Sequence, residues 1–121
     1  MNILKEIAAY AVKRVQQAER KMPLETVKEQ ALALPGKEFV FEYVLRKPEL
    51  SFICECKKAS PSKGIIADDF PYLKIAQEYE QAGVDCISVL TEPKYFLGDD
   101  SYLQEIAQAV SVPVSYTHLR A

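Results

Sequence analysis

The stretch that decides the fold begins with SFICECK, residues 51–57, and continues through a helical segment to DCISVL, residues 85–90. Both quoted segments are short, apolar and rich in strand-favouring residues, which is typical of strands buried on both faces. A second helical segment leads to VPV, residues 112–114, which begins a third apolar strand. The alternation of strands and helices predicts a parallel sheet with right-handed crossovers. An open doubly wound sheet and a (βα)8 barrel both fit this order.

Two helices are predicted between these strands. The first begins near Pro71, with Asp69 as its N-terminal cap, and ends at Gly83. The second begins at Ser101, where Gln104 three residues later completes a capping-box pattern. Their apolar faces are formed, in chain order, by Leu73, Ile75, Ala76, Tyr79 and Ala82, and by Leu103, Ile106, Ala107 and Val110.

Residues 1–48 precede the first strand and are predicted to be largely helical. Apolar residues recur at helical spacing from Ile3 to Ala18, and Asn2 is expected to cap this helix. A second helix follows Pro23 and ends before Pro35-Gly36. KEFVFEYVLRK, residues 37–47, fits both a strand alternation and a helix face. We favour a helix there because Pro48 and the following segment supply a clear break.

Composition narrows the functional classes. The chain has 121 residues, 49% of them hydrophobic, and a net charge of -2, which suits one small domain. There is no basic excess to indicate nucleic acid as a partner. The apolar runs are far shorter than the roughly 20 residues that span a bilayer, so we expect no membrane insertion. Three cysteines favour free thiols over a disulfide framework, and thus a cytoplasmic location.

The strand in residues 51–57 carries the most informative charges. Side chains alternate along a strand, so Glu55 and Lys57 should share one face, with Cys54 and Cys56 on the other. Both charged residues lie at the carboxyl end, where active sites of parallel α/β folds collect. A lysine there can bind phosphate or carboxylate, or act as an acid. A simple Glu–Lys pair at a sheet edge explains the pattern equally well.

The remaining motifs are less specific. Two cysteines on one strand face, with one distant Cys86 and the single histidine His118 in the tail, do not complete a zinc site. The polar loop KKASPSKG, residues 57–64, can hold an anion but is no Walker or dinucleotide motif. TEPKYFLG, residues 91–98, puts two aromatic residues in a turn. They either fold back onto the core or form a wall for a flat substrate.

Two longer motifs carry a resemblance. ICECKKASPSKG, residues 53–64, and ISVLTEPKYFLG, residues 87–98, resemble indole-3-glycerol-phosphate synthases, the (βα)8-barrel enzymes of tryptophan biosynthesis. Phosphoribosylanthranilate isomerase is another phosphate-binding barrel enzyme, and its motifs do not match these two stretches. The resemblance implies a truncated TIM (βα)8 barrel with its first two to three βα units in residues 49–114. A helical extension, residues 1–48, would precede them, and an atypical tail, either native or non-native, would follow in residues 115–121.

The same resemblance implies an activity and a site. The family closes the indole ring of 1-(2-carboxyphenylamino)-1-deoxyribulose 5-phosphate with loss of CO2 and water, as a carbon–carbon lyase without cofactor or metal. Glu55 then matches a glutamate that holds substrate hydroxyls and the acid–base network, and Lys57 matches a lysine that contacts anionic groups and takes part in proton transfer. Ser60 and Pro61 match the turn beside the substrate carboxylate, and Phe96 matches an aromatic residue near the anthranilate ring.

The tail departs from the family pattern. SYTHLRA, residues 115–121, stands where the family continues into a catalytic lysine followed by Asp-Phe. We therefore expect residues 1–121 alone to be inert and poorly stable, with open sheet edges that favour self-association or complementation by other barrel pieces. Because carboxyl ends of parallel strands lie together, the loops in residues 58–67 and 91–100 should lie on one face.

Overall fold

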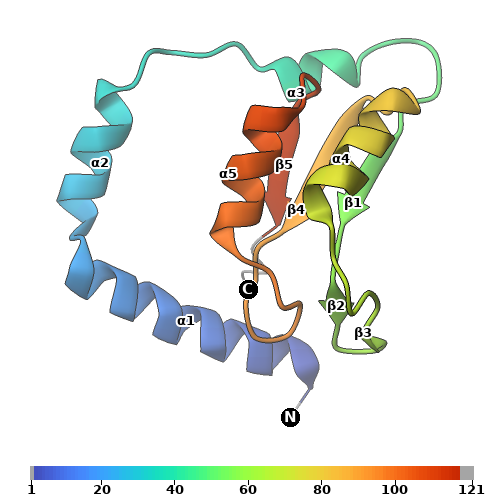
Figure 1. The fold of residues 1–121 in the computed structure, drawn as a ribbon. Helices are drawn as coiled ribbons and strands as arrows, with labels where there is room; N and C mark the ends of the chain where they lie inside the picture. Colours follow the sequence, from blue (N-terminus) through green and yellow to red (C-terminus); the bar gives the residue numbers. More distant parts are fainter. Residues whose placement is uncertain (1, 118–121) are drawn as a thin grey trace. The chain divides into compact units, whose positions relative to one another are not determined.

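The computed structural model describes residues 2–117 (Figure 1). Within that range the chain divides after Glu38 into two compact units, which are considered separately. The first unit contains α1 (Ile3–Lys21) and α2 (Leu24–Ala33). The predicted cap of α1 is confirmed, since the side chain of Asn2 accepts a hydrogen bond from the Lys5 backbone N–H at 3.0 Å.

The second unit is built on a three-stranded parallel sheet with the order β1-β4-β5. Its strands are β1 (Ile53–Cys56), β4 (Cys86–Leu90) and β5 (Val114–Thr117). The crossover helices are α4 (Tyr72–Gln81) and α5 (Asp100–Ala109). This order confirms the predicted alternation of strands and helices.

A short helix, α3 (Val40–Val44), precedes the sheet. The helical interpretation of residues 37–47 is confirmed, although only five residues form the helix. Asp85 ties the chain after α3 to the sheet: its carboxylate accepts hydrogen bonds from Lys47 Nζ at 2.6 Å and from the Phe52 backbone N–H at 2.8 Å. The entry into β1 is thus fixed against the start of β4.

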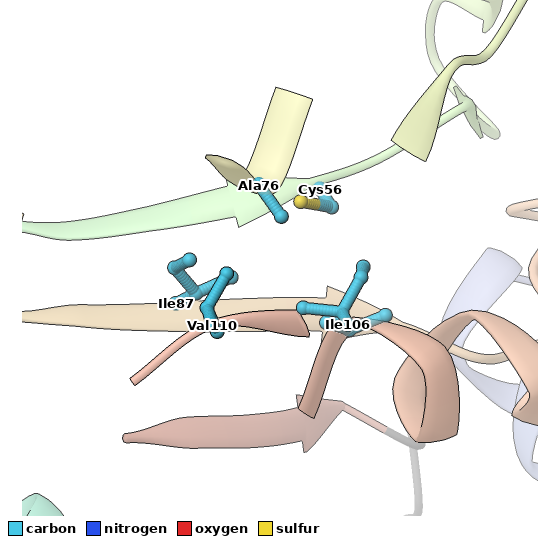
Figure 2. Close-up of a cluster of buried hydrophobic side chains, with 6 residues drawn as sticks. Cys56, Ala76, Ile87, Ile106 and Val110 are labelled. Carbon is cyan, nitrogen blue, oxygen red and sulfur yellow. The ribbon is translucent and has the colours of Figure 1, made fainter. Parts of the chain in front are cut away.

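Both crossover helices pack on the same face of the sheet, where the core of this unit lies (Figure 2). The core joins Cys56 of β1 to Ala76 of α4 and Ile106 of α5, all at most 1% exposed. Ile87 and Val89 of β4 complete its sheet side. Apolar residues of two strands and two helices therefore meet in one layer, as the burial of a parallel sheet face requires.

The structure corrects two predicted caps and two buried positions. Helix α4 begins at Tyr72, so Asp69 lies too far ahead of it to reach the first free amides, and no side chain caps it. Helix α5 begins at Asp100 and is capped by Asp99, which accepts from the Ser101 N–H at 2.8 Å, so Ser101 lies inside the helix. Two alanines expected in the core are exposed, Ala82 and Ala107.

The long loop after β1 contains a small hairpin that the sequence did not indicate. Strands β2 (Ala59–Ser60) and β3 (Gly64–Ile65) pair antiparallel. At the edge of the sheet opposite β1, β5 extends through residues 115–117 of the tail, paired with β4. The rest of the tail, including His118, lies outside the described residues.

Candidate functional site

Glu55, the charged residue of β1, lies on the sheet face opposite the core. In the parallel register Glu55 is the partner of Ser88, and Cys56 is the partner of the core residue Val89. The predicted alternation is therefore confirmed for Glu55 and Cys56. Ser88 Oγ donates to Glu55 Oε2 at 3.4 Å, which links the two strands across this face.

Lys57 follows Glu55 at the carboxyl end of β1 and pairs with it. The Lys57 Nζ to Glu55 Oε1 distance is 3.2 Å, and the two side chains are 36% and 37% exposed. An ion pair this open to solvent adds little to stability. Its groups stay accessible to a ligand, and together they offer a cation, a carboxylate and a neighbouring hydroxyl.

The hairpin after β1 places the predicted Ser60 and Pro61. Ser60 is almost fully buried at 9% exposure, and its Oγ accepts from the Lys63 backbone N–H at 3.2 Å. Pro61 is exposed at the tip of the hairpin. The hydroxyl of Ser60 therefore holds the turn of the hairpin.

The loop after β4 is organised around a buried acid, Glu92. Its side chain is 0% exposed and accepts hydrogen bonds from the backbone N–H groups of Lys94 at 3.0 Å, Tyr95 at 2.6 Å and Phe96 at 3.0 Å. The predicted ligand residue Phe96 is half-buried in this loop. Its backbone position is thus set by the Glu92 carboxylate.

The hairpin and the loop after β4 lie at the same end of the sheet (Figure 1). Each follows the carboxyl end of one of two neighbouring parallel strands, β1 and β4. The prediction that the two loops share a face is confirmed. The structure brings Glu55 and Lys57 into direct contact, and it places Ser60, Pro61 and Phe96 in the loops that border them.

Sequence reasoning missed Ser88 and Glu92. Ser88 is signalled by its polar side chain at the centre of DCISVL, an otherwise apolar strand, but its partner across the sheet follows only from the register. Glu92 follows Thr91 after the end of β4, in a loop rich in apolar residues, where an acid followed by several free backbone amides favours a turn-capping role.

The thiols lie apart from this face. Burial raises the pKa of Cys56 to about 11, and burial also raises the pKa of Cys86. Cys54, the partner of the core residue Ile87 in the register, is half-buried. All three cysteines are free, and residues 2–117 contain no group of three or more metal-ligating side chains. Every helix in that range is too short or too polar to span a bilayer.

The family model and the curated relatives that match this chain carry the same description. The family model described as indole-3-glycerol phosphate synthase matches residues 4–118. The synthase of Ruminiclostridium cellulolyticum is 50% identical over 113 residues, which cover 93% of this chain and 44% of that protein. The synthase of Lactiplantibacillus plantarum is 53% identical over 105 residues, 84% of this chain and 40% of that protein.

The chain matches an N-terminal portion of longer family sequences. The chain spans less than half the length of the curated relatives it matches, which include the synthase of Lachnoclostridium phytofermentans at 43% identity. The match nevertheless covers both compact units and both loops that border Glu55 and Lys57. The chain belongs to the indole-3-glycerol phosphate synthase family.

Proposed function

We propose that the protein to which this chain contributes closes an indole ring, converting 1-(2-carboxyphenylamino)-1-deoxyribulose 5-phosphate to indole-3-glycerol phosphate with loss of CO2 and water. The observation that carries the proposal is the Glu55–Lys57 pair on the open sheet face, bordered by the two loops. Residues 49–114 then form the first βα units of a (βα)8 barrel, preceded by the helical extension 1–48 and followed by an atypical tail.

The proposed ring closure requires a cation beside the anionic substrate. In the proposed reaction a carbon–carbon bond forms, the carboxylate leaves as CO2, and a hydroxyl leaves as water after gaining a proton. The Lys57 ammonium can hold the substrate carboxylate and supply that proton. The Glu55 carboxylate can hold substrate hydroxyls, and it keeps Lys57 in place from 3.2 Å.

The bordering loops supply the rest of the pocket in this proposal. Ser60 and Pro61 lie beside the substrate carboxylate, and Phe96 packs against the anthranilate ring. Hydrogen bonds within the two loops support this, because the Ser60 hydroxyl accepts from the Lys63 N–H and the Phe96 N–H donates to Glu92, so both residues are held in place. No cofactor is required for the proton transfers and bond changes named above.

The open edges of the sheet favour pairing with further β-strands. Within the described residues β1 and β5 are its two edges, and their outer N–H and C=O groups have no strand beside them in the sheet. We propose that these edges pair with further barrel strands, or with a second copy when those strands are missing. The free cysteines favour a cytoplasmic location for the protein.

The test uses a full-length protein. Residues 1–114 are joined to the part of the Ruminiclostridium cellulolyticum relative that follows its match to Val114; we refer to the product as the joined protein. It should form indole-3-glycerol phosphate, followed by fluorescence. Lys57→Met should lower kcat by about 100-fold or more, as expected for loss of a positioned proton donor.

The matched control is Lys74→Met, which removes an exposed lysine from α4. It should leave the rate within about twofold, since surface changes rarely disturb a folded protein. An inactive joined protein with native circular dichroism would contradict the proposal. Equal rates for Lys57→Met and Lys74→Met would remove Lys57 from the chemistry.

A further inference from the structure

The loop in residues 91–98, which we term the Glu92 loop, is folded around a single carboxylate. Glu92 Oε2 accepts from the backbone N–H groups of Tyr95 and Phe96, and Oε1 accepts from that of Lys94. Hydrogen bonds to a carboxylate are roughly twice as strong as neutral ones. Three consecutive amides therefore point at one buried acid, and their positions depend on it.

Backbone contacts also hold the end of the Glu92 loop in place. The Gly98 N–H donates to the carbonyl of Glu92 at 2.8 Å, and Leu97 adopts a left-handed conformation with φ of 52°. Gly98 also lies against the end of β4, where an added Cβ would meet the carbonyl oxygen of Leu90 at 2.3 Å. The Glu92 loop is thus anchored to the strand that carries Ser88, and it has little freedom to shift.

Glu92 does more than fill space in the loop, because three backbone N–H groups depend on its carboxylate. An apolar side chain at position 92 would remove the carboxylate that these three part-buried N–H groups share, which is costly. The anchored segment ends at Phe96, the residue that the proposed function places against the substrate ring. The Glu92 carboxylate and Phe96, which would form the wall against the substrate ring, therefore belong to one rigid loop.

We propose that Glu92 is a positioning residue that fixes the backbone of Phe96, and so sets the affinity of the site for the aromatic half of the substrate. This inference rests on the proposed function. Glu92 is fully buried, so its effect passes through the loop and Glu92 itself does not touch substrate. The proposal places only the aromatic half of the substrate against the Glu92 loop, so binding of the phosphate end should not depend on that loop.

Glu92→Gln is the informative substitution because it keeps size and shape. A glutamine offers one acceptor oxygen and one NH2 group. If the oxygen serves the amides of Tyr95 and Phe96, the NH2 group meets the N–H of Lys94, and two donors face each other. The variant therefore loses the charge and at least one loop hydrogen bond without opening a cavity.

The matched control is Glu80→Gln. Glu80 also accepts two backbone N–H groups, those of Ser111 at 2.5 Å and Val112 at 3.2 Å, ahead of β5 and at the other end of the sheet. Like Glu92 it is a glutamate that accepts backbone N–H groups, here both on Oε2 of a half-buried side chain, and it lies away from the proposed site. A loss of stability common to both variants is thereby separated from an effect on ligand binding.

The experiment measures binding and turnover in the joined protein. Anthranilate, titrated by its fluorescence, probes the ring wall, and inorganic phosphate probes the other end. For Glu92→Gln we expect about tenfold weaker anthranilate binding, a KM raised by a similar factor and kcat within about twofold, from the loss of one charge-assisted hydrogen bond. Phosphate affinity should stay unchanged, and Glu80→Gln should change neither affinity.

Amide hydrogen exchange supplies a readout that needs no activity. The amides of Lys94, Tyr95 and Phe96 should exchange faster in Glu92→Gln and stay protected in Glu80→Gln. Unchanged anthranilate affinity, or an equal loss for anthranilate and phosphate, would overturn the positioning role. If the unsubstituted joined protein makes no product, the proposed function fails, and unchanged exchange in Glu92→Gln would then separately overturn the role of Glu92.

Discussion

Gly98→Ala should be among the most damaging single-methyl additions in this chain. The new Cβ would lie 2.3 Å from the Leu90 carbonyl oxygen and 2.8 Å from the carbonyl carbons of Leu90 and Thr91. All three are backbone atoms at the end of β4, so no side chain can move aside. Relief requires the Glu92 loop or the strand to shift by more than half an ångström.

The cost follows from two parts of the geometry. Overpacking of this kind costs about 1–3 kcal/mol. A shift also weakens the 2.8 Å hydrogen bond from Gly98 to the Glu92 carbonyl, which adds about 1 kcal/mol. We therefore expect a loss of about 3 kcal/mol in the free energy of unfolding, together with weaker anthranilate binding.

The assay is urea denaturation of the joined protein, with Gly36→Ala and Gly83→Ala for comparison. Gly36 has open space around it, so its substitution should be neutral within about 0.5 kcal/mol. Gly83 has open space but a φ of +92°, so alanine there should cost about 1–2 kcal/mol from backbone strain alone. A Gly98→Ala variant as stable as Gly36→Ala would refute the proposed anchoring of the loop.

Three further predictions concern acid stability, thiol reactivity and the isolated chain. The hydrogen bond from Lys47, and then that from the Phe52 amide, lower the pKa of Asp85, so its stabilising effect is present above its unfolded-state value of about 3.9 and is lost as pH falls through the lower folded value. In pH-dependent denaturation, Asp85→Asn should therefore be less stable than the parent at pH 6, and the gap should narrow below pH 4; a constant gap would exclude this titration. At pH 8 the half-buried Cys54 should react with iodoacetamide at least tenfold faster than Cys56, whose burial raises its pKa to about 11; peptide mass spectrometry of native protein would contradict this by showing equal labelling. Residues 1–121 alone should show no turnover and should elute as oligomers in size-exclusion chromatography, because the sheet has open edges; an active, monodisperse monomer would refute this.

The sheet was predictable because its signals are local. Strands such as CISVL are apolar and bounded by breakers, and the alternation in ICEC alone separates Glu55 from Cys56. The end of α4 was predictable for the same reason, since Gly83 adopts the left-handed conformation that commonly ends a helix. Each of these features depends on residues adjacent in sequence.

The caps and the loop interior were not predictable in the same way. Asp99, Ser101 and Asp69 are all good capping residues, and the choice among them depends on where packing starts each helix. Glu92 accepts hydrogen bonds from backbone N–H groups two to four positions later in the sequence. These bonds form only once the loop has folded. Ser88 meets Glu55 only through the register of two strands 33 residues apart.

Whether the Glu55–Lys57 face is the ring-closing site can be seen in a crystal structure of the joined protein with indole-3-glycerol phosphate. We expect Lys57 Nζ or the Glu55 carboxylate at about 2.6–3.2 Å from polar atoms of the ligand, with the indole ring against Phe96. A ligand bound with neither Glu55 nor Lys57 in contact, or on the face that carries α4 and α5, would contradict it.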